Sequence, residues 1–288
     1  MGNPISTRFT PHFGRLPAEQ LMQAAKEMGL DALDLPRITP EWKKMLDDAG
    51  LVVGSVDAQG IGQLFSTDAS KRQSAVDGIK GQFENIATCG GKVIFMCLVP
   101  ENHSAPRAEN FSLWKDVFPH VVEAAEQNDL YIAIEGWPGP GPYYPTLGCT
   151  PEMWRAMFKE IPSKHFGLNY DPSHLVRLGI DHMRALSEFI DRIYHCHGKD
   201  TVMLPEELYA SGNINPTFGT SYGFSEGSWR YCIPGEGTVD WKKVAFRLQA
   251  AGYQGAVGVE LEDHRYWGSL EAEQKGISRA VAHLKQAF

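Results

Sequence analysis

Four side chains that can hold a divalent metal each stand at the end of a short apolar run. Glu135 follows "YIAI", Asp171 follows "LNY", His197 closes "IYHCH" and Glu260 follows "AVGV". A set of carboxylate and imidazole donors suits a divalent metal of intermediate hardness, such as Mn²⁺, Co²⁺ or Mg²⁺. Such a metal polarises a carbonyl and stabilises an enediolate, and a neighbouring carboxylate can remove the proton from the adjacent carbon. The four residues therefore indicate metal-assisted proton transfer.

Each of these residues, taken alone, also has an ordinary structural interpretation. A carboxylate after a strand commonly caps the next helix, and Asp171 followed by Pro172 has the sequence of such a cap. A lone histidine such as His197 most often makes ordinary hydrogen bonds. Intervals of 36, 26 and 63 residues separate the four along the chain, so helical periodicity cannot produce the pattern. The prediction of a metal site depends on all four lying on one face of a single fold.

Eight short β-rich runs, separated by amphipathic helical segments, are the elements that would bring these residues together. The runs comprise residues 5–10, 31–35, 51–57, 92–99, 130–135, 165–170, 192–198 and 255–262. Alternating strands and helices imply parallel βα units, and eight of them predict an α/β protein with a single (β/α)8 TIM barrel over residues 1–288. An open doubly wound sheet is the alternative, although no G-x-G-x-x-G follows the first run. In a barrel, the carboxyl ends of all strands share the face that carries the active site.

A long segment, about residues 201–236, interrupts this alternation and has no helical period beyond "PEELYAS". Loops of that length are usually functional or disordered. Its stretch "TSYGFSEGSWRY" is rich in aromatic residues and glycine, so we predict an active-site loop that acts as a lid. Arg230 within it can bind a phosphate, carboxylate or hydroxyl of a substrate, or form a surface salt bridge.

Other residues close to the strand ends are candidates for substrate contact. Lys199 lies two residues beyond His197 and can neutralise developing oxyanion charge. Trp137 lies in the loop "EGWPGPGPYYP", whose aromatic side chains can stack on a sugar ring or pack the loop itself. His195 shares the face of His197 but lies deeper in the barrel, so we interpret it as a supporting or core residue. Glu262 points in the same direction as Glu260 by strand alternation.

Composition and charge exclude several classes of function. The 288 residues carry a formal net charge of −8, which disfavours binding to nucleic acid. Five cysteines are odd in number and scattered, which predicts reduced thiols and a cytoplasmic protein. No apolar run is long enough to span a membrane, and the first residues have no apolar signal core. The expected partner is a small molecule, with the oligomeric state left open because barrels of this kind often associate.

Four motifs, "NYDPSHL", "HCHGKD", "PGEGTVDW" and "GYQGAVGVELED", resemble the sugar phosphate isomerase/epimerase superfamily, the xylose-isomerase-like TIM barrels. The resemblance runs from about Asp31 to the C-terminus. It implies a substrate-hydroxyl ligand at His174, an acid/base pair of Glu135 and Glu260, and a divalent metal, Mn²⁺ before Mg²⁺, Co²⁺ or Zn²⁺. The metal ligands that it implies are Glu135, Asp171, His197 and Glu260. Many relatives have Asn-His after the first glutamate and "EHED" near the last, whereas this chain has "EGWPG" and "ELED".

The favoured function is a metal-dependent isomerase or epimerase that acts on a sugar or polyol-like carbonyl compound through a metal-bound enediolate. A lyase or dehydratase on the same site, which dehydrates a cyclic polyol or cleaves a C-glycoside, is the first alternative. An endonuclease of the same superfamily needs more histidines and a basic groove, against which the net charge argues. A non-catalytic subunit that binds a sugar or a partner is a further alternative, and it would predict a missing metal ligand.

Overall fold

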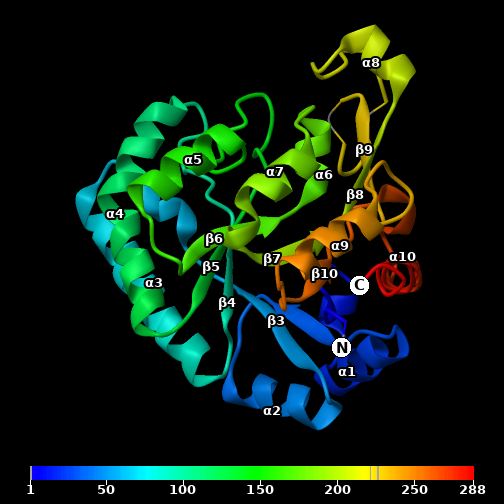
Figure 1. Ribbon diagram of the computed structural model, residues 1–288, viewed down its shortest axis with the longest axis horizontal. Coiled ribbons are helices and arrows are strands. Elements are labelled where there is room, and N and C mark those ends of the chain that lie inside the picture. The colour runs from blue at the N-terminus through cyan, green and yellow to red at the C-terminus, as the bar shows by residue number, and fades with distance from the viewer. Residues whose placement is uncertain (1, 221, 226) are drawn as a thin grey trace.

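Eight parallel strands form a nearly closed barrel in the computed structural model, which describes residues 2–220, 222–225 and 227–288 (Figure 1). The strands are β1 (Ile5–Thr7), β2 (Ala32–Leu35), β3 (Val52–Asp57), β4 (Val93–Met96), β5 (Tyr131–Glu135), β6 (Phe166–Tyr170), β7 (Ile193–Gly198) and β10 (Val257–Val259). Their order is β1-β10-β7-β6-β5-β4-β3-β2. The amide of Asp31 donates to the carbonyl of Ile5 at 2.8 Å, which joins the two ends of this order. The single-domain TIM barrel predicted from the sequence is confirmed, and the open sheet is not formed.

Helices surround the barrel and connect its strands (Figure 1). They are α1 (Ala18–Glu27), α2 (Pro40–Ala49), α3 (Ala69–Thr88), α4 (Arg107–Gln127), α5 (Pro151–Glu160), α6 (Pro172–Arg177), α7 (His182–Phe189), α8 (Pro205–Ser211), α9 (Trp241–Ala250) and α10 (Leu270–Leu284). Threonine caps begin α2 and α5, where Thr39 and Thr150 accept hydrogen bonds from amides of the first turn. Gly50 ends α2 with a left-handed φ of 70°, which residues other than glycine rarely adopt. No helix among the described residues is long and apolar enough to cross a membrane.

Aromatic side chains fill the layer between the helices and the strands. Trp114 and Phe118 of α4 stack with ring centroids 5.1 Å apart, and Phe118 meets Phe166 of β6 at 5.2 Å. All three are buried. Because large aromatic side chains bury the most apolar area, this packing fixes the position of β6, and with it the residues that follow β6.

The centre of the barrel is polar, although branched apolar residues usually fill this space. Ser6, Asp34, Ser55 and His195 all point inward and are at most 2% exposed. The hydroxyls of Ser6 and Ser55 donate to Asp34 at 2.9 and 3.1 Å, and His195 Nε2 lies 3.3 Å from Asp34 Oδ1. The position of His195 agrees with its interpretation as a supporting residue.

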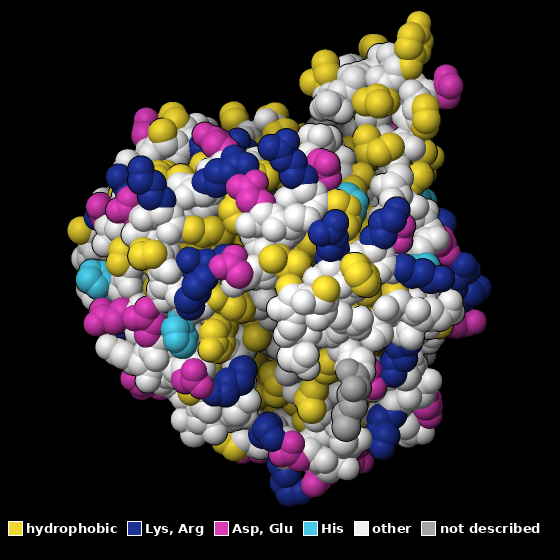
Figure 2. Space-filling model, in the orientation of Figure 1, with side chains coloured by type: hydrophobic (Ala, Val, Ile, Leu, Met, Phe, Trp, Pro, Cys, Tyr) yellow, Lys and Arg dark blue, Asp and Glu magenta, His cyan; other side chains and the backbone are white. Residues whose placement is uncertain are grey.

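The segment predicted as a long loop over residues 201–236 is partly regular. Strand β8 (Asp200–Met203) pairs antiparallel with β9 (Trp229–Cys232), and α8 lies between them. Residues 204–220, 222–225, 227 and 228, which we call the arm, project from the barrel (Figure 1). Figure 2 shows hydrophobic side chains gathered on this projection, where Tyr209 is 91% and Phe218 99% exposed. Ser221 and Glu226 of the predicted lid lie outside the described residues, and its function as a lid stays a prediction.

Candidate metal centre and active site

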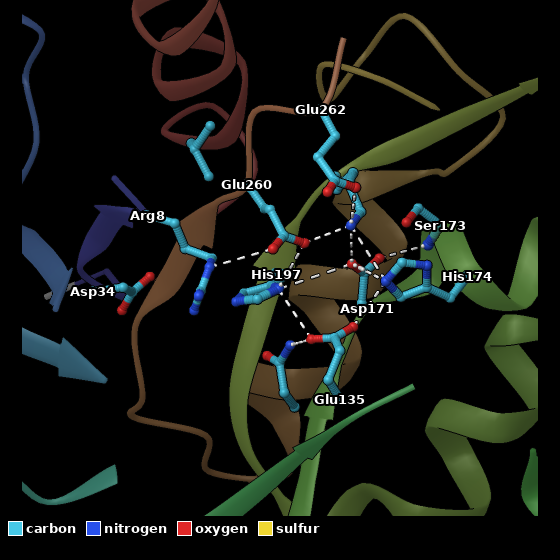
Figure 3. Close-up of polar contacts among 12 residues, drawn as sticks. Arg8, Asp34, Glu135, Asp171, Ser173, His174, His197, Glu260 and Glu262 are labelled. Carbon is cyan, nitrogen blue, oxygen red and sulfur yellow. Dashed lines mark hydrogen bonds and ion pairs between the residues drawn. The ribbon is translucent and has the colours of Figure 1, made fainter. Parts of the chain in front are cut away.

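The four predicted metal ligands converge at the carboxyl ends of β5, β6, β7 and β10 (Figure 3). His197 Nδ1 lies 3.2 Å from Glu135 Oε2, 3.2 Å from Glu260 Oε2 and 3.9 Å from Asp171 Oδ2. His197 is fully buried, and Glu135 and Asp171 are 3% exposed. One imidazole nitrogen therefore faces three carboxylates from three different strands, which is the convergence that the strand-end pattern predicts.

Several polar atoms of this cluster have no hydrogen-bond partner. They are Glu135 Oε1, Asp171 Oδ2 and both ring nitrogens of His197. Glu135 Oε1 lies 3.0 Å from His174 Nε2 and Asp171 Oδ2 lies 3.2 Å from Lys199 Nζ, so both have an ion-pair neighbour. Buried polar atoms that make no hydrogen bond still indicate a missing ligand. Glu135, Asp171 and His197 offer ligand atoms within 4.8 Å of one another, as do Asp171, His174 and Glu260. The donor set and its unpartnered atoms fit a divalent metal.

Asp171 combines the two interpretations that the sequence left open. Its Oδ1 accepts a hydrogen bond from the amide of Ser173 at 2.8 Å and so caps α6, with Pro172 in the first turn. Its Oδ2 makes no hydrogen bond and faces the cluster. The cap therefore leaves Oδ2 directed toward the cluster, and metal binding by this oxygen stays a prediction.

His174, in the first turn of α6, lies inside the same cluster. Its Nε2 is 3.0 Å from Glu135 Oε1 and 3.3 Å from Asp171 Oδ2. Its Nδ1 is 2.5 Å from the hydroxyl of Tyr231, which also accepts a hydrogen bond from Arg177 at 2.9 Å. Tyr231 therefore holds the imidazole at Nδ1, and Nε2 faces the carboxylates of Glu135 and Asp171.

Lys199 supplies the positive charge at the centre of the cluster. Its Nζ lies 3.2 Å from Asp171 Oδ2, 2.5 Å from Glu260 Oε2 and 3.0 Å from Glu262 Oε2, and the residue is 1% exposed. Burial acts to lower the pKa of Lys199, but the three carboxylates outweigh it and raise that pKa above its usual value. Lys199 is therefore charged and bound in the carboxylate cluster.

Arg8 belongs to the site although the sequence analysis did not select it. Its guanidinium forms two hydrogen bonds of 2.9 Å to Asp57, and its Nε lies 3.3 Å from Glu260 Oε1. It also lies 4.3 Å above the ring of Phe95, which stacks on His197 at 5.2 Å. The strand-end rule could have found Arg8, because β1 ends at Thr7, but the predicted first strand extended to residue 10.

The structure places Arg230 away from this cluster. Its guanidinium binds Glu207 with two bonds of 2.8 and 2.9 Å and also contacts Ser225 in the arm. Tyr231, the next residue of β9, instead faces Lys199 and His174. Successive residues of a strand point to opposite sides, and the ion pair with Glu207 is the salt bridge that the sequence left open for Arg230. Binding of a substrate by Arg230 stays a prediction.

Trp137 lies two residues beyond β5, in a partly exposed loop. Nearby in this loop, the hydroxyl of Tyr144 donates to Asn215 of the arm at 3.3 Å. Stacking of Trp137 on a sugar ring stays a prediction. Asn169, which the sequence analysis missed, donates a hydrogen bond to Glu135 Oε2 and is buried. It precedes Asp171 by two residues, so strand alternation could have indicated it.

Comparisons with known proteins agree with this geometry. The uncharacterized protein YfiH of Bacillus subtilis is 34% identical over 97% of both chains. Inosose dehydratase of Geobacillus thermodenitrificans is 34% identical over 154 residues, which are 54% of this chain and about half (48%) of the dehydratase. The crystal structure of 3-keto-D-glucoside 4-epimerase from E. coli shares the fold, with a TM-score of 0.69 and 19% identity over 99% of each chain. The family model for the xylose isomerase-like TIM barrel matches residues 22–287, and the chain belongs to that family.

Proposed function

We propose that the protein is a metal-dependent isomerase or epimerase of a sugar or polyol-like carbonyl compound. The observation that carries this proposal is the placement of Glu135 and Glu260, whose Oε2 atoms each lie 3.2 Å from His197 Nδ1. Two carboxylates thus lie next to the same imidazole nitrogen at the carboxyl face of the barrel. This arrangement suits removal of a proton from a bound carbon and its return from another direction.

Both glutamates are held in the ionised form that accepts a proton. Burial acts to raise the pKa of Glu135, but in the metal-free protein the charge of His197 outweighs it and holds that pKa below its usual value. A bound cation would take over this effect when His197 binds it as a neutral ring. Burial acts likewise on Glu260, where the charge of Lys199 is the main cause of a lowered pKa. One glutamate removes the proton from the carbon beside the carbonyl, which leaves an enediolate. Return of a proton to the opposite face of that carbon gives an epimer, and return to the neighbouring carbon gives an isomer.

Four residues would hold the metal, and their donor set suits a divalent ion such as Mn²⁺, Co²⁺ or Mg²⁺. They are Glu135, Asp171, His197 and Glu260, and the unpartnered atoms among them support this assignment. The family resemblance puts Mn²⁺ first, before Mg²⁺, Co²⁺ or Zn²⁺. When bound, a divalent cation polarises the carbonyl of the substrate and stabilises the negative charge that develops on its oxygen.

Other side chains would orient the substrate and offset its charge. The hydroxyl of Tyr231 fixes His174, which is then placed to hydrogen-bond a substrate hydroxyl. Lys199 lies where its ammonium offsets charge on a substrate oxygen close to Glu260. Trp137, at the partly exposed edge of the site, would stack on the sugar ring.

Dehydration is the second candidate, and Lys199 is the observation that favours it. In a dehydration, a base removes the proton beside the carbonyl, the C–O bond on the next carbon breaks, and an acid protonates the departing hydroxide to give water. The ammonium of Lys199, 2.5 Å from Glu260 Oε2, is a buried acid beside the proposed base. The 34% identity to an inosose dehydratase over 154 residues also supports this candidate.

An NMR experiment in deuterated water separates the two reactions. The Mn²⁺-treated protein is incubated with a panel of ketoses and cyclic polyol ketones, the Mn²⁺ is removed by chelation, and the products are recorded. Deuterium at the carbon beside the carbonyl, without loss of water, supports isomerisation or epimerisation, whereas loss of water supports dehydration. A protein that binds no divalent metal and exchanges no proton in any substrate contradicts both.

A further inference from the structure

Asp34 lies on the side of His197 opposite Glu135 and Asp171 (Figure 3). Asp34, His195 and His197 offer ligand atoms within 4.8 Å of one another, and the rings of the two histidines meet edge to face at 5.5 Å. The residue comes from β2, whereas the proposed metal ligands come from β5, β6, β7 and β10. A buried carboxylate therefore lies behind the metal-facing imidazole, and the proposed reaction gives it no function.

The position of this carboxylate is fixed on several sides. Ser6 donates to one of its oxygens at 2.9 Å and Ser55 to the other at 3.1 Å. A Cβ atom at Gly258 would overlap Asp34 Oδ2, and one at Gly54 would overlap Oδ1. The neighbouring strands therefore leave space for a carboxylate at one place and hold it there.

The two nitrogens of His197 face different groups. Nδ1 faces the carboxylates of Glu135 and Glu260 at 3.2 Å, so Nδ1 is the nitrogen that would bind a metal. Its lone pair is then used for the metal, and the ring proton must be on Nε2. Nε2 has no hydrogen-bond partner within the described part of the chain, and a buried N–H without an acceptor is costly.

We propose that Asp34 is a positioning residue that accepts the Nε2 proton of His197, directly or through one water molecule, and so fixes its metal-binding tautomer. Metal-binding histidines commonly donate their second ring N–H to a carboxylate, which orients the ring and makes the other nitrogen a better donor. Asp34, His195 and His197 each offer a ligand atom within 4.8 Å of the others, and His195 Nε2 lies 3.3 Å from Asp34 Oδ1. A small shift or one bridging water molecule would bring Asp34 to the Nε2 proton of His197. The inference rests on the metal site of the proposed function, and it adds a residue from the opposite side of the barrel.

Asp34→Asn tests this inference, because the amide keeps the size of the side chain and can still bond to both serines. The readouts are the Zn²⁺ dissociation constant by competition with a chromophoric chelator and the NMR signal of the His197 Nε2 proton in ¹⁵N-histidine protein loaded with Zn²⁺. We expect the variant to bind Zn²⁺ about 10- to 100-fold more weakly. Its Nε2 proton signal should move upfield and exchange faster with water, an effect that a purely structural residue would not produce.

Glu273→Gln is the matched control. Glu273 is also fully buried, and it accepts hydrogen bonds from Thr10 and Phe13 instead of facing the metal site. This variant should lose thermal stability and keep the Zn²⁺ affinity of the wild type.

Three results would overturn the inference in distinguishable ways. Equal Zn²⁺ affinity and an unchanged Nε2 proton signal in Asp34→Asn would remove the inference and leave the proposed function intact. Binding of two Zn²⁺ ions by the wild type and one by the variant would make Asp34 a metal ligand instead of a positioning residue. A wild-type protein that binds no Zn²⁺, Mn²⁺ or Co²⁺ would remove the proposed function itself.

Discussion

Replacement of Lys199 by methionine tests whether its ammonium and a divalent metal neutralise the same carboxylates. The Nζ atom contacts Asp171, Glu260 and Glu262 at 3.2, 2.5 and 3.0 Å from a 1% exposed position. Methionine keeps most of the volume of the side chain but removes the charge. Removing one partner of a buried ion pair costs about 3–5 kcal/mol, because the remaining charges stay buried without compensation.

The expected change in Tm follows from the length of the chain. With 288 residues and an unfolding entropy of about 2.1 cal/mol/K per residue, the total is about 0.6 kcal/mol/K. A loss of about 3–5 kcal/mol then lowers the Tm of the metal-free protein by about 5–8 °C. A bound divalent cation supplies the missing charge, so the Tm of the Mn²⁺-saturated variant should fall by less than half of this. By linkage, the variant should bind Mn²⁺ at least about tenfold more tightly than the wild type.

Differential scanning calorimetry with and without Mn²⁺ measures both effects. Lys92→Met is the control, because Lys92 pairs with Asp129 on the surface at 2.6 Å and exposed pairs contribute at most about 1 kcal/mol. That control should shift the Tm by about 2 °C or less in either state. An equal loss of Tm in the Lys199 variant with and without metal would refute the idea that lysine and metal neutralise one cluster.

Three further predictions concern catalysis and packing. Glu135→Gln and Glu260→Gln should each lower kcat/KM by a factor of about 10²–10⁴ with unchanged circular dichroism, since each loses a proton acceptor; full activity in either would contradict the mechanism. Tyr231→Phe removes the hydroxyl that bridges an imidazole and a guanidinium. Loss of the bond that holds the imidazole should lower kcat/KM about tenfold, and unchanged kinetics would exclude this function for the tyrosine. Gly258→Ala, whose Cβ would overlap the carboxylate in the barrel centre, should lose about 1–3 kcal/mol in urea unfolding. Gly78→Ala, in open space on α3, should gain about 0.5–1 kcal/mol, and equal effects of the two alanines would argue against the packing explanation.

The convergence of the four candidate metal ligands was predictable because it depends on the simplest regularity of the fold. Every strand of a parallel barrel ends on the same face, so Glu135, Asp171, His197 and Glu260 could be grouped from strand assignments alone. Asp34 was not predictable in this way. Both sides of a barrel strand are buried, so the stretch "DALDL" has no exposed face. Its pattern therefore does not indicate that Asp34 points into the barrel while the leucines on either side of it point outward.

The arm could not be predicted from the sequence for a different reason. The arm connects β8 and β9, which form a two-stranded sheet of their own outside the barrel, so no alternation of strands and helices indicates it. Within β9, the side of the strand that faces the barrel decides whether Arg230 or Tyr231 lies next to the cluster. The sequence analysis selected Arg230 because its side chain is charged. Two short antiparallel strands outside a parallel barrel are too short to show a sequence period. The sequence therefore does not indicate which of their side chains point toward the barrel.

The cap formed by Asp171 links the lifetime of the site to the stability of a six-residue helix. One carboxylate oxygen holds the first turn of α6 through the amide of Ser173, and His174 lies in that turn. Any local opening of α6 therefore releases a proposed metal ligand and a proposed substrate-binding residue together, before the barrel itself unfolds. Amide hydrogen exchange at Ser173 thus reports directly on how often the intact site comes apart in solution.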